Sequence, residues 1–328
     1  MNIPDDVLRA IAEASSILIT THVIPDGDAI GSMLGMKMAL EQIGLSPVAA
    51  ISDPVPASLR FLPGAGSVLG PEDLLSSYGV ALVLDCGDIE RVGRVANAVR
   101  GSAAVVNVDH HATNDEFGTY NWVDTQAAAT AELAAQIIRA LGVEYTPEIA
   151  ACLYAGISTD TGSFRYSNTR AATLRTAAEL IEAGARPWEI AQNIYDSKPY
   201  GSLAALAEVI LGIEFSCDGL LASMNITAEI MAKHGVSEGD TEGYIGYARS
   251  VAGVEAAVAF REAPDGLIRI GFRSKEKVDV ARVASDFGGG GHVRASGCTM
   301  PGPLPEARSK VMLRLRTALR EAGYTWTE

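Results

Sequence analysis

Three short apolar runs in the first half of the chain are each followed at once by aspartate or histidine. They are ILITT at 17–21, VALVL at 80–84 and AAVVNV at 103–108, followed by His22, Asp85 and Asp109. Uninterrupted apolar runs of this length are typical of strands buried on both faces of a sheet. Helix-like segments lie at about 29–43, 89–99 and 127–141, and Pro147 is placed to open another helix. We therefore predict an α/β fold whose parallel sheet carries helices on both faces.

The second half of the chain has a different pattern. Strands are predicted at 219–226, 254–261 and 267–273, the last two joined by a Pro-Asp-Gly turn, and helices at about 279–286 and 304–322. The segment DSKPYGS at 196–202 contains proline and glycine and is the predicted linker. A chain of 328 residues suits two domains, since a domain usually has about 100–200 residues. We predict these domains at 1–195 and 203–328, the second also α/β.

Charge and cysteine usage exclude some classes of protein. Lys and Arg total 26 and Asp and Glu total 40, a formal net charge of −14, which argues against a partner such as long duplex nucleic acid. A short anionic substrate held by metal ions or a local basic patch remains compatible with this charge. The four cysteines are scattered without a CxxC pair, which favours a reducing cytoplasm over a disulfide framework. Neither a signal peptide nor a membrane span is expected.

Candidate site residues concentrate in four polar stretches. They are THVIPDGDAIGS with His22, Asp26 and Asp28, LVLDCGD with Asp85, VVNVDHHATND with Asp109, His110 and His111, and GISTDTGSF with Asp160. Ligands bind at the carboxyl ends of strands in open α/β sheets, which is where three of these stretches fall. Singly, Asp28 and Asp85 could equally be helix caps, and Asp160 could lie in a turn or cap a helix.

Taken together, the four stretches offer carboxylate oxygens and imidazole nitrogens from three strand ends and a further polar loop. This donor set suits two divalent ions such as Mn²⁺, Co²⁺ or Mg²⁺ better than a thiolate-bound zinc. Two ions about 3.5–4 Å apart can share a bridging hydroxide and clamp a phosphoryl group. The residues therefore predict phosphoester hydrolysis.

The same stretches resemble a known family. HVIPDGDAIGS, LDCGD, VDHH and STDTGSF are similar, in this order, to the four phosphoesterase motifs of the DHH family. FGGGGHVRASG at 287–297 resembles the glycine-rich motif of its companion DHHA1 domain. The resemblance covers nearly the whole chain. It implies a DHH domain at 1–195 with a dimetal centre, a DHHA1 substrate-binding domain at 203–328, and an active site in the cleft between them.

The resemblance also implies roles for individual residues. His22 and Asp26 would bind one metal ion, Asp28, His110 and Asp160 would bind the second, and Asp85 would bridge them. Mn²⁺ is the expected metal. Asp109 would orient a histidine rather than bind metal, as partners of metal-site histidines commonly do. His111 would face the scissile phosphate as a general acid or as a stabiliser of charge.

The glycine run 288–291 has its own physical interpretation. Glycines let backbone N–H groups approach an anion that side chains would otherwise keep away. The resemblance implies that this segment and its basic neighbours hold one end of the substrate, through Arg273, Gly289, Gly290, Gly291, His292 and Arg294. A flexible loop between a helix and a strand is the alternative interpretation of the glycines. Lys275 and Lys277 extend a basic patch that could equally be an ordinary solvated strand end.

The implied activity is metal-dependent hydrolysis of very short nucleotides. The lengths of both halves are most similar to the stand-alone oligoribonuclease (nanoRNase) and pAp phosphatase group of the family. Expected substrates are short oligoribonucleotides, dinucleotides such as pApA and pGpG, and 3′-phosphoadenosine 5′-phosphate (pAp). A cyclic dinucleotide phosphodiesterase, an inorganic pyrophosphatase and a non-catalytic nucleotide sensor remain as alternatives. A homodimer is implied by the resemblance alone, and no membrane partner is expected.

Overall fold

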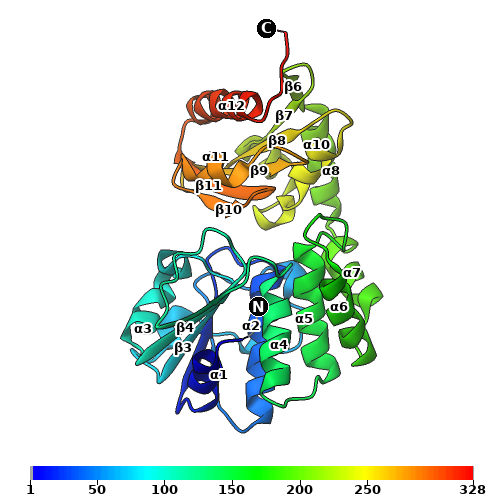
Figure 1. Cartoon of the computed structure of the whole chain (residues 1–328). Helices are drawn as coiled ribbons and strands as arrows, with labels where there is room; N and C mark the ends of the chain where they lie inside the picture. Colours follow the sequence, from blue (N-terminus) through cyan, green and yellow to red (C-terminus); the bar gives the residue numbers. More distant parts are fainter. Residues whose placement is uncertain (1–2, 328) are drawn as a thin grey trace. The chain divides into compact units, whose positions relative to one another are not determined.

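The computed structural model describes residues 3–327, which divide into two compact units. The first unit extends to Ser197 and the second begins at Lys198. Of the predicted linker, residues 196–199 lie between helices α7 and α8, whereas residues 200–202 already belong to α8. Figure 1 shows the elements of each unit, and an active site in a cleft between the domains stays a prediction.

The first unit contains a five-stranded parallel sheet in the order β2-β1-β3-β4-β5. The three strands predicted from the apolar runs are present. The short strand β2 and the strand β5 were not predicted, because neither is a continuous apolar run. The strands are β1 (Ile17–Thr20), β2 (Val48–Ala49), β3 (Val80–Leu84), β4 (Ala104–Asp109) and β5 (Tyr120–Val123).

Helices cover both faces of this sheet, as predicted. Alternate residues of β3 point to opposite sides, so Leu82 packs with the core under α2, α4 and α5, while Val83 packs with the core around α3. Figure 1 shows α3 and α2 on opposite sides of β3 and β4. The stretch 89–99 is only partly α-helical, since Gly93 has a φ of +66° that breaks a 3₁₀ segment at Ile89–Val95. The helices are α1 (Asp5–Ala12), α2 (Gly27–Gln42), α3 (Ala96–Gly101), α4 (Thr130–Ala140), α5 (Pro147–Asp160), α6 (Ala171–Glu182) and α7 (Pro187–Tyr195).

Glycines let α2 and α5 approach each other closely. A Cβ atom on Gly31 would lie 2.4 Å from the carbonyl oxygen of Cys152, and one on Gly27 would lie 2.3 Å from the Thr159 hydroxyl. Gly156 on α5 is equally restricted, since its Cβ would lie 2.7 Å from Ala131. The contact joins the beginning of α2 to the end of α5, so it brings the polar residues at these two helix ends together.

The second unit contains a mixed six-stranded sheet in the order β10-β11-β9-β8-β7-β6. Among the described strands of this sheet, β7 and β8 pair in parallel and the other neighbouring pairs are antiparallel. One face packs on α11 and α12, and the other on α8, α9 and α10. The strands are β6 (Glu214–Ser216), β7 (Leu221–Ile226), β8 (Ala256–Glu262), β9 (Leu267–Ser274), β10 (Gly290–His292) and β11 (Ala295–Pro301), and the helices are α8 (Tyr200–Leu211), α9 (Ala228–His234), α10 (Tyr244–Ser250), α11 (Val280–Ser285) and α12 (Leu304–Glu321). Within residues 3–327, no helix combines the length and apolar character needed to cross a bilayer.

Candidate metal centre

Three of the predicted site residues lie at the carboxyl ends of neighbouring strands. His22 lies two residues after β1, Asp85 directly follows β3, and Asp109 is the last residue of β4. Because these strands are adjacent and parallel, their carboxyl ends meet at one edge of the sheet. Asp85 has a φ of +55°, in the left-handed region, where non-glycine residues are uncommon and often lie at functional sites.

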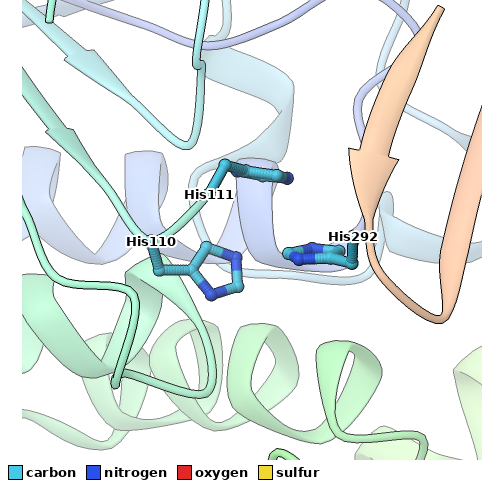
Figure 2. A group of neighbouring side chains, drawn as sticks. All are labelled: His110, His111 and His292. Carbon is cyan, nitrogen blue, oxygen red and sulfur yellow. The ribbon is translucent and has the colours of Figure 1, made fainter. Parts of the chain in front are cut away.

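His110 and His111 follow β4 directly, and Figure 2 shows their neighbouring rings. The ring centroids are 4.8 Å apart at an interplanar angle of 69°. Both residues are buried, with 6% and 8% of their surfaces exposed. Buried imidazoles need fixed polar partners, so two consecutive ones indicate a site rather than an ordinary turn.

Asp26 and Asp28 begin α2, and each is fixed by backbone N–H groups. Asp26 is the N-cap, since its Oδ1 accepts from the N–H groups of Asp28 and Ala29 at 3.0 and 3.1 Å. The alternative that Asp28 caps this helix is therefore wrong. Asp28 is buried, and its two oxygens accept from the N–H groups of Thr130 and Ala131 at 2.6 and 2.8 Å. These are the first amides of α4, whose positive end favours a carboxylate.

Asp160 is the last residue of α5 and not part of a polar loop, so the predicted loop is wrong at this position. The Thr159 hydroxyl donates to the carbonyl of Ala155 at 2.9 Å, and that of Thr161 donates to Ile157 at 2.6 Å. Hydroxyls that bond back along a helix are satisfied within it, so this polar stretch continues α5. The close packing of α5 against α2 then brings Asp160 near Asp28.

The six predicted metal ligands form two groups of three. Ligand atoms of one group lie within 4.8 Å of one another, and so do those of the other. The first group is His22, Asp26 and Asp85, and the second is Asp28, His110 and Asp160. The family resemblance implies the same two groups. Asp85, which it implies as the bridging residue, falls in the first group. The ligand roles themselves stay a prediction.

Asp85 lies between the two groups. Its Oδ2 is 3.5 Å from Nε2 of His22, and its Oδ1 is 3.5 Å from Nε2 of His110. The same nitrogen of His110 is 3.7 Å from Asp28 Oδ2 and 3.6 Å from Asp160 Oδ2. These distances are too long for hydrogen bonds. They are close to the roughly 3.0–3.4 Å that separates donor atoms sharing an ion at about 2.1 Å.

Backbone carbonyls fix the two histidines that are predicted to bind metal. Nδ1 of His22 is 2.8 Å from the carbonyl oxygen of Val23, and Nδ1 of His110 is 3.3 Å from that of Ala127. A carbonyl oxygen only accepts, so Nδ1 carries the proton in both rings. Nε2 then faces the carboxylates and is the nitrogen left to bind a metal ion, which is the arrangement typical of metal-binding histidines.

Asp109 connects His111 to the side-chain amides of partly buried Asn114 and buried Asn107. Its Oδ1 accepts from His111 Nδ1 and its Oδ2 from Asn114 Nδ2, both at 2.7 Å. Asn114 also donates to Asn107 Oδ1 at 2.8 Å, and Asn107 donates to the carbonyl of Cys86 at 3.0 Å. Asp109 also forms a third candidate group with Asp85 and His111. Its hydrogen bonds at both oxygens favour the positioning role that the sequence predicts.

The gathered carboxylates repel one another strongly. Burial, followed by the charges of Asp85 and Asp160, raises the pKa of Asp28 well above its ordinary value. Burial, together with the charges of Asp26 and Asp85, raises the pKa of Asp160 to about 6. Burial acts in the same direction on Asp85, but the surrounding histidines outweigh it and its pKa is lowered. The cluster is therefore short of positive charge.

The neighbouring carboxylates raise the pKa values of His22 and His111. Burial alone would lower the pKa of His111, but the hydrogen bond and charge of Asp109 raise it to about 9. Burial likewise opposes the charged form of His22, and its contact with Asp85 raises its pKa above the ordinary value. The negative charge of the site therefore favours the protonated forms of His22 and His111.

Two divalent cations fit this set of residues. Carboxylate oxygens and imidazole nitrogens suit Mn²⁺, Mg²⁺ or Co²⁺, and cations would offset the repulsion among the buried aspartates. The nearby thiol of Cys86 is not a suitable ligand, because burial raises its pKa to about 12 and keeps it protonated.

The glycine-rich segment forms an edge hairpin rather than a flexible loop. Gly290 and His292 belong to β10, which pairs antiparallel with β11. A Cβ atom on Gly289 would lie 2.2 Å from the carbonyl oxygen of Gly297, and Gly291 has a φ of +132°. The close backbone contact therefore accounts for these two glycines, and their contact with an anion stays a prediction.

The two predicted substrate-binding arginines make contacts within their own unit. Arg294 donates from Nη1 to the carbonyl of Val278 at 2.7 Å and from Nη2 to that of Glu276. Arg273 donates from Nη1 to the carbonyl of Phe272 at 2.9 Å. Arg294 therefore holds the segment between β9 and α11, and contact of either arginine with substrate stays a prediction.

Two residues of the site were missed in the sequence. The Thr130 hydroxyl donates to Asp85 Oδ1 at 3.0 Å, and Asn114 holds Asp109 as described above. Thr130 is a lone hydroxyl in an alanine-rich run and is the first residue of α4, and a threonine in this position is a signal for a helix N-terminus. Asn114 lies three residues after His111 in a polar stretch, and nothing in its spacing distinguished it from a turn residue.

Family profiles match both units. The DHH family, N-terminal domain, matches residues 16–157, and the DHHA1 domain matches residues 223–320. These matches confirm the family resemblance and the α/β class of both parts.

Similar proteins extend over nearly the whole chain. The bifunctional oligoribonuclease and PAP phosphatase NrnA of Thermus thermophilus is 37% identical over 325 residues, covering 99% of this chain and 96% of that protein. The protein of the same name in Bacillus subtilis is 30% identical over 299 residues, covering 90% and 92%. A crystal structure of an exopolyphosphatase-related protein from Bacteroides fragilis has a TM-score of 0.86 at 26% identity, covering 97% and 95%.

Proposed function

The chain belongs to the DHH family, with a DHHA1 domain after its DHH domain, and we propose that it hydrolyses phosphoester bonds in very short nucleotides. The proposed substrates are short oligoribonucleotides, linear dinucleotides such as pApA and pGpG, and pAp. The observation that carries the proposal is the division of the six ligand candidates, of which all but Asp26 are buried or partly buried, into two groups of three. The names of the relatives, oligoribonuclease and PAP phosphatase, support the substrate class.

The proposed catalytic centre contains two divalent ions. His22 and Asp26 would hold one, Asp28, His110 and Asp160 would hold the other, and Asp85 would contact both. When bound, such ions polarise the phosphoryl group and lower the pKa of the attacking water. Manganese is the proposed metal, supported by the oxygen and nitrogen donors.

The protein's own groups orient the reaction. The hydrogen bond between His111 Nδ1 and Asp109 fixes the ring and leaves Nε2 for the substrate. His111 is therefore the proposed proton donor to the leaving oxygen or the stabiliser of its charge. Asn114 completes the arrangement, since it prevents rotation of the Asp109 carboxylate.

Recognition of the nucleotide end is proposed for the second unit. The backbone of Gly289–His292 and the side chains of His292 and Arg273 form the proposed contact, with Arg294 bracing the neighbouring segment. The matched DHHA1 domain supports this division of roles.

Three further properties complete the proposal. A homodimer is proposed from the family resemblance, and light scattering after size-exclusion chromatography tests it. Cytoplasmic location is proposed because Cys86, Cys152, Cys217 and Cys298 are all free and buried. We also propose that long duplex nucleic acid is not a partner, because the chain has a net charge of −14.

A substrate panel tests the proposal. The purified chain with Mn²⁺ is incubated with pAp, pApA, a 5-mer and a 24-mer RNA, cyclic di-AMP and pyrophosphate. We expect turnover of pAp, pApA and the 5-mer, loss of turnover on chelation, and no turnover by the variant Asp85→Asn, which controls for contaminating enzymes. Turnover of pyrophosphate with inert pApA would instead favour the pyrophosphatase alternative. Binding without any turnover would favour the sensor.

A further inference from the structure

The face of the second sheet that carries Arg273 also carries a pair of arginines with no assigned role. Residues 269, 271 and 273 of β9 point to the face of the sheet on which α10 packs, so Arg269 shares this face with Arg273, and both side chains stay partly exposed. Arg261 lies directly opposite Arg269 on the antiparallel strand β8. Two like charges directly opposite each other destabilise a sheet unless something anionic offsets them.

The two guanidinium groups have unused donors. The side chains of Arg261 and Arg269 are only 24% and 29% exposed. The Nε of each is buried and makes no hydrogen bond to any residue in the range 3–327. A buried donor without an acceptor is costly, so an oxygen acceptor supplied by a ligand would stabilise the pair.

Acidic residues of the protein compensate the pair only in part. Asp265 accepts from Arg269 Nη2 at 2.8 Å, and Thr299 accepts from Nη1 at 3.3 Å, so this side chain is held in place. Glu238 Oε2 lies 3.9 Å from Arg261 Nη1 and 4.0 Å from Arg269 Nε, which is beyond hydrogen-bond distance. Burial lowers the pKa of Arg261, partly offset by Glu238 and Glu242, in agreement with incomplete compensation.

Small residues separate this pair from Arg273. Gly271 lies between Arg269 and Arg273 on β9, and Gly297 lies opposite it on β11. Both are partly exposed, and the nearest atom to a Cβ on Gly271 would be the Ile245 side chain at 3.8 Å. Four residues of strand span roughly 13 Å, which is further than the distance between the two phosphates of one nucleotide.

We propose that Arg261 and Arg269 form a phosphate subsite that binds an internal phosphodiester of an oligoribonucleotide, with Glu238 as the carboxylate that the phosphate displaces. The proposal rests on the proposed function for its substrate class. A phosphodiester oxygen would make the direct hydrogen bonds to Nε that Glu238 does not make. A single nucleotide held near Arg273 is too short to reach the pair, so the subsite favours longer substrates over pAp.

Calorimetric binding in EDTA tests the subsite without hydrolysis. The full chain is titrated with a 5′-phosphorylated pentaribonucleotide and, separately, with pAp. The variant Arg269→Gln loses one charge-assisted donor group, so we expect its Kd for the pentamer to rise roughly tenfold while its Kd for pAp stays within about twofold. Glu238→Gln removes the competing carboxylate and is expected to lower the Kd for the pentamer several-fold.

Arg316→Gln is the matched control, because Arg316 is an exposed arginine of α12, the helix that packs on the opposite face of the sheet. It is expected to leave both affinities unchanged. An equal loss of affinity for pAp and pentamer in Arg269→Gln, or unchanged pentamer binding in both subsite variants, would overturn the subsite. If Arg269→Gln fails to fold, Glu238→Gln alone decides, since a tighter pentamer supports the subsite and an unchanged one removes it. Hydrolysis of pAp after Mn²⁺ is added reports separately on the proposed function.

Discussion

The two units each gather side chains of like charge, but they do so at different depths. In the first unit, Asp28, Asp85 and Asp109 are at most 2% exposed. In the second, Arg261 and Arg269 keep about a quarter of their side chains exposed. Residues 1–195 carry 11 basic and 23 acidic residues, a net charge of −12, whereas residues 196–328 carry 15 and 17, a net charge of −2.

The difference in burial indicates two kinds of ligand. Deeply buried carboxylates cannot be screened by water, so they need cations that stay bound. The partly exposed Arg261 and Arg269 tolerate partial compensation by Glu238 and can exchange it for a transient anion. The acidic centre is therefore suited to permanent metal ions and the arginine pair to a substrate that arrives and leaves.

The largest effect on activity is expected from a change of Asp85, which lies between the two groups of predicted metal ligands. Asp85→Asn removes the charge that faces both groups and should lower kcat on pAp by on the order of 10³-fold or more, since metal ions supply several kcal/mol of transition-state stabilisation. Exposed Asp73, in a 3₁₀ turn, gives the control Asp73→Asn with unchanged kcat. Near-normal turnover in Asp85→Asn would remove this residue from the centre.

Next in size is the loss of the histidine oriented by Asp109. His111→Ala should lower kcat at least roughly 10²-fold while the two bound ions are retained, because general acid catalysis contributes about this factor. Rates on pAp and metal content are measured in the same preparation. A loss of metal along with the rate would show that His111 is a ligand.

A smaller effect on kcat is expected from a change of Asn114, whose side chain bonds to Asp109, which in turn bonds to the His111 ring. Asn114→Ala frees one oxygen of Asp109 and should lower kcat about 10–100-fold with KM little changed, as for other residues that support metal sites. Asn193→Ala is the control, because Asn193 is exposed on α7 and its side chain donates to a carbonyl of its own helix. A rise in KM with kcat preserved would contradict the positioning role.

The smallest effect is expected from a change in the packing of α2 against α5, which brings Asp28 near Asp160. Gly31→Ala places a methyl group against the Cys152 carbonyl and should destabilise the first unit by roughly 1–3 kcal/mol, lowering its Tm by a few degrees. Gly246→Ala is the control in the second unit, since that helical glycine has no atom near its Cβ position and alanine is the better helix former. Equal Tm changes in the two variants would contradict the close α2–α5 contact.

The sequence predicted the parts of the site that follow strand ends. His22, Asp85 and Asp109 were found because uniformly apolar runs mark buried parallel strands, whose carboxyl ends share one edge. The helical position of Asp160 was not predicted, because its hydroxyl-rich neighbours are typical of turns and their bonds to helix carbonyls depend on tertiary packing.

Contacts between distant segments could not be predicted either. Thr130 reaches Asp85 across 45 positions of sequence, and Arg294 bonds to Val278 rather than pointing freely into solvent. The short edge strands around Gly290 and Val48 were missed because their pairing partners, and not their own composition, make them strands.

The number of Mn²⁺ ions bound per chain tests the central claim most directly. Equilibrium dialysis of the metal-free chain against Mn²⁺ is predicted to give two ions per wild-type chain and fewer in Asp85→Asn. Binding of fewer than two ions by the wild-type chain, or unchanged binding in the variant, would contradict a centre built from His22, Asp26 and Asp85 beside Asp28, His110 and Asp160.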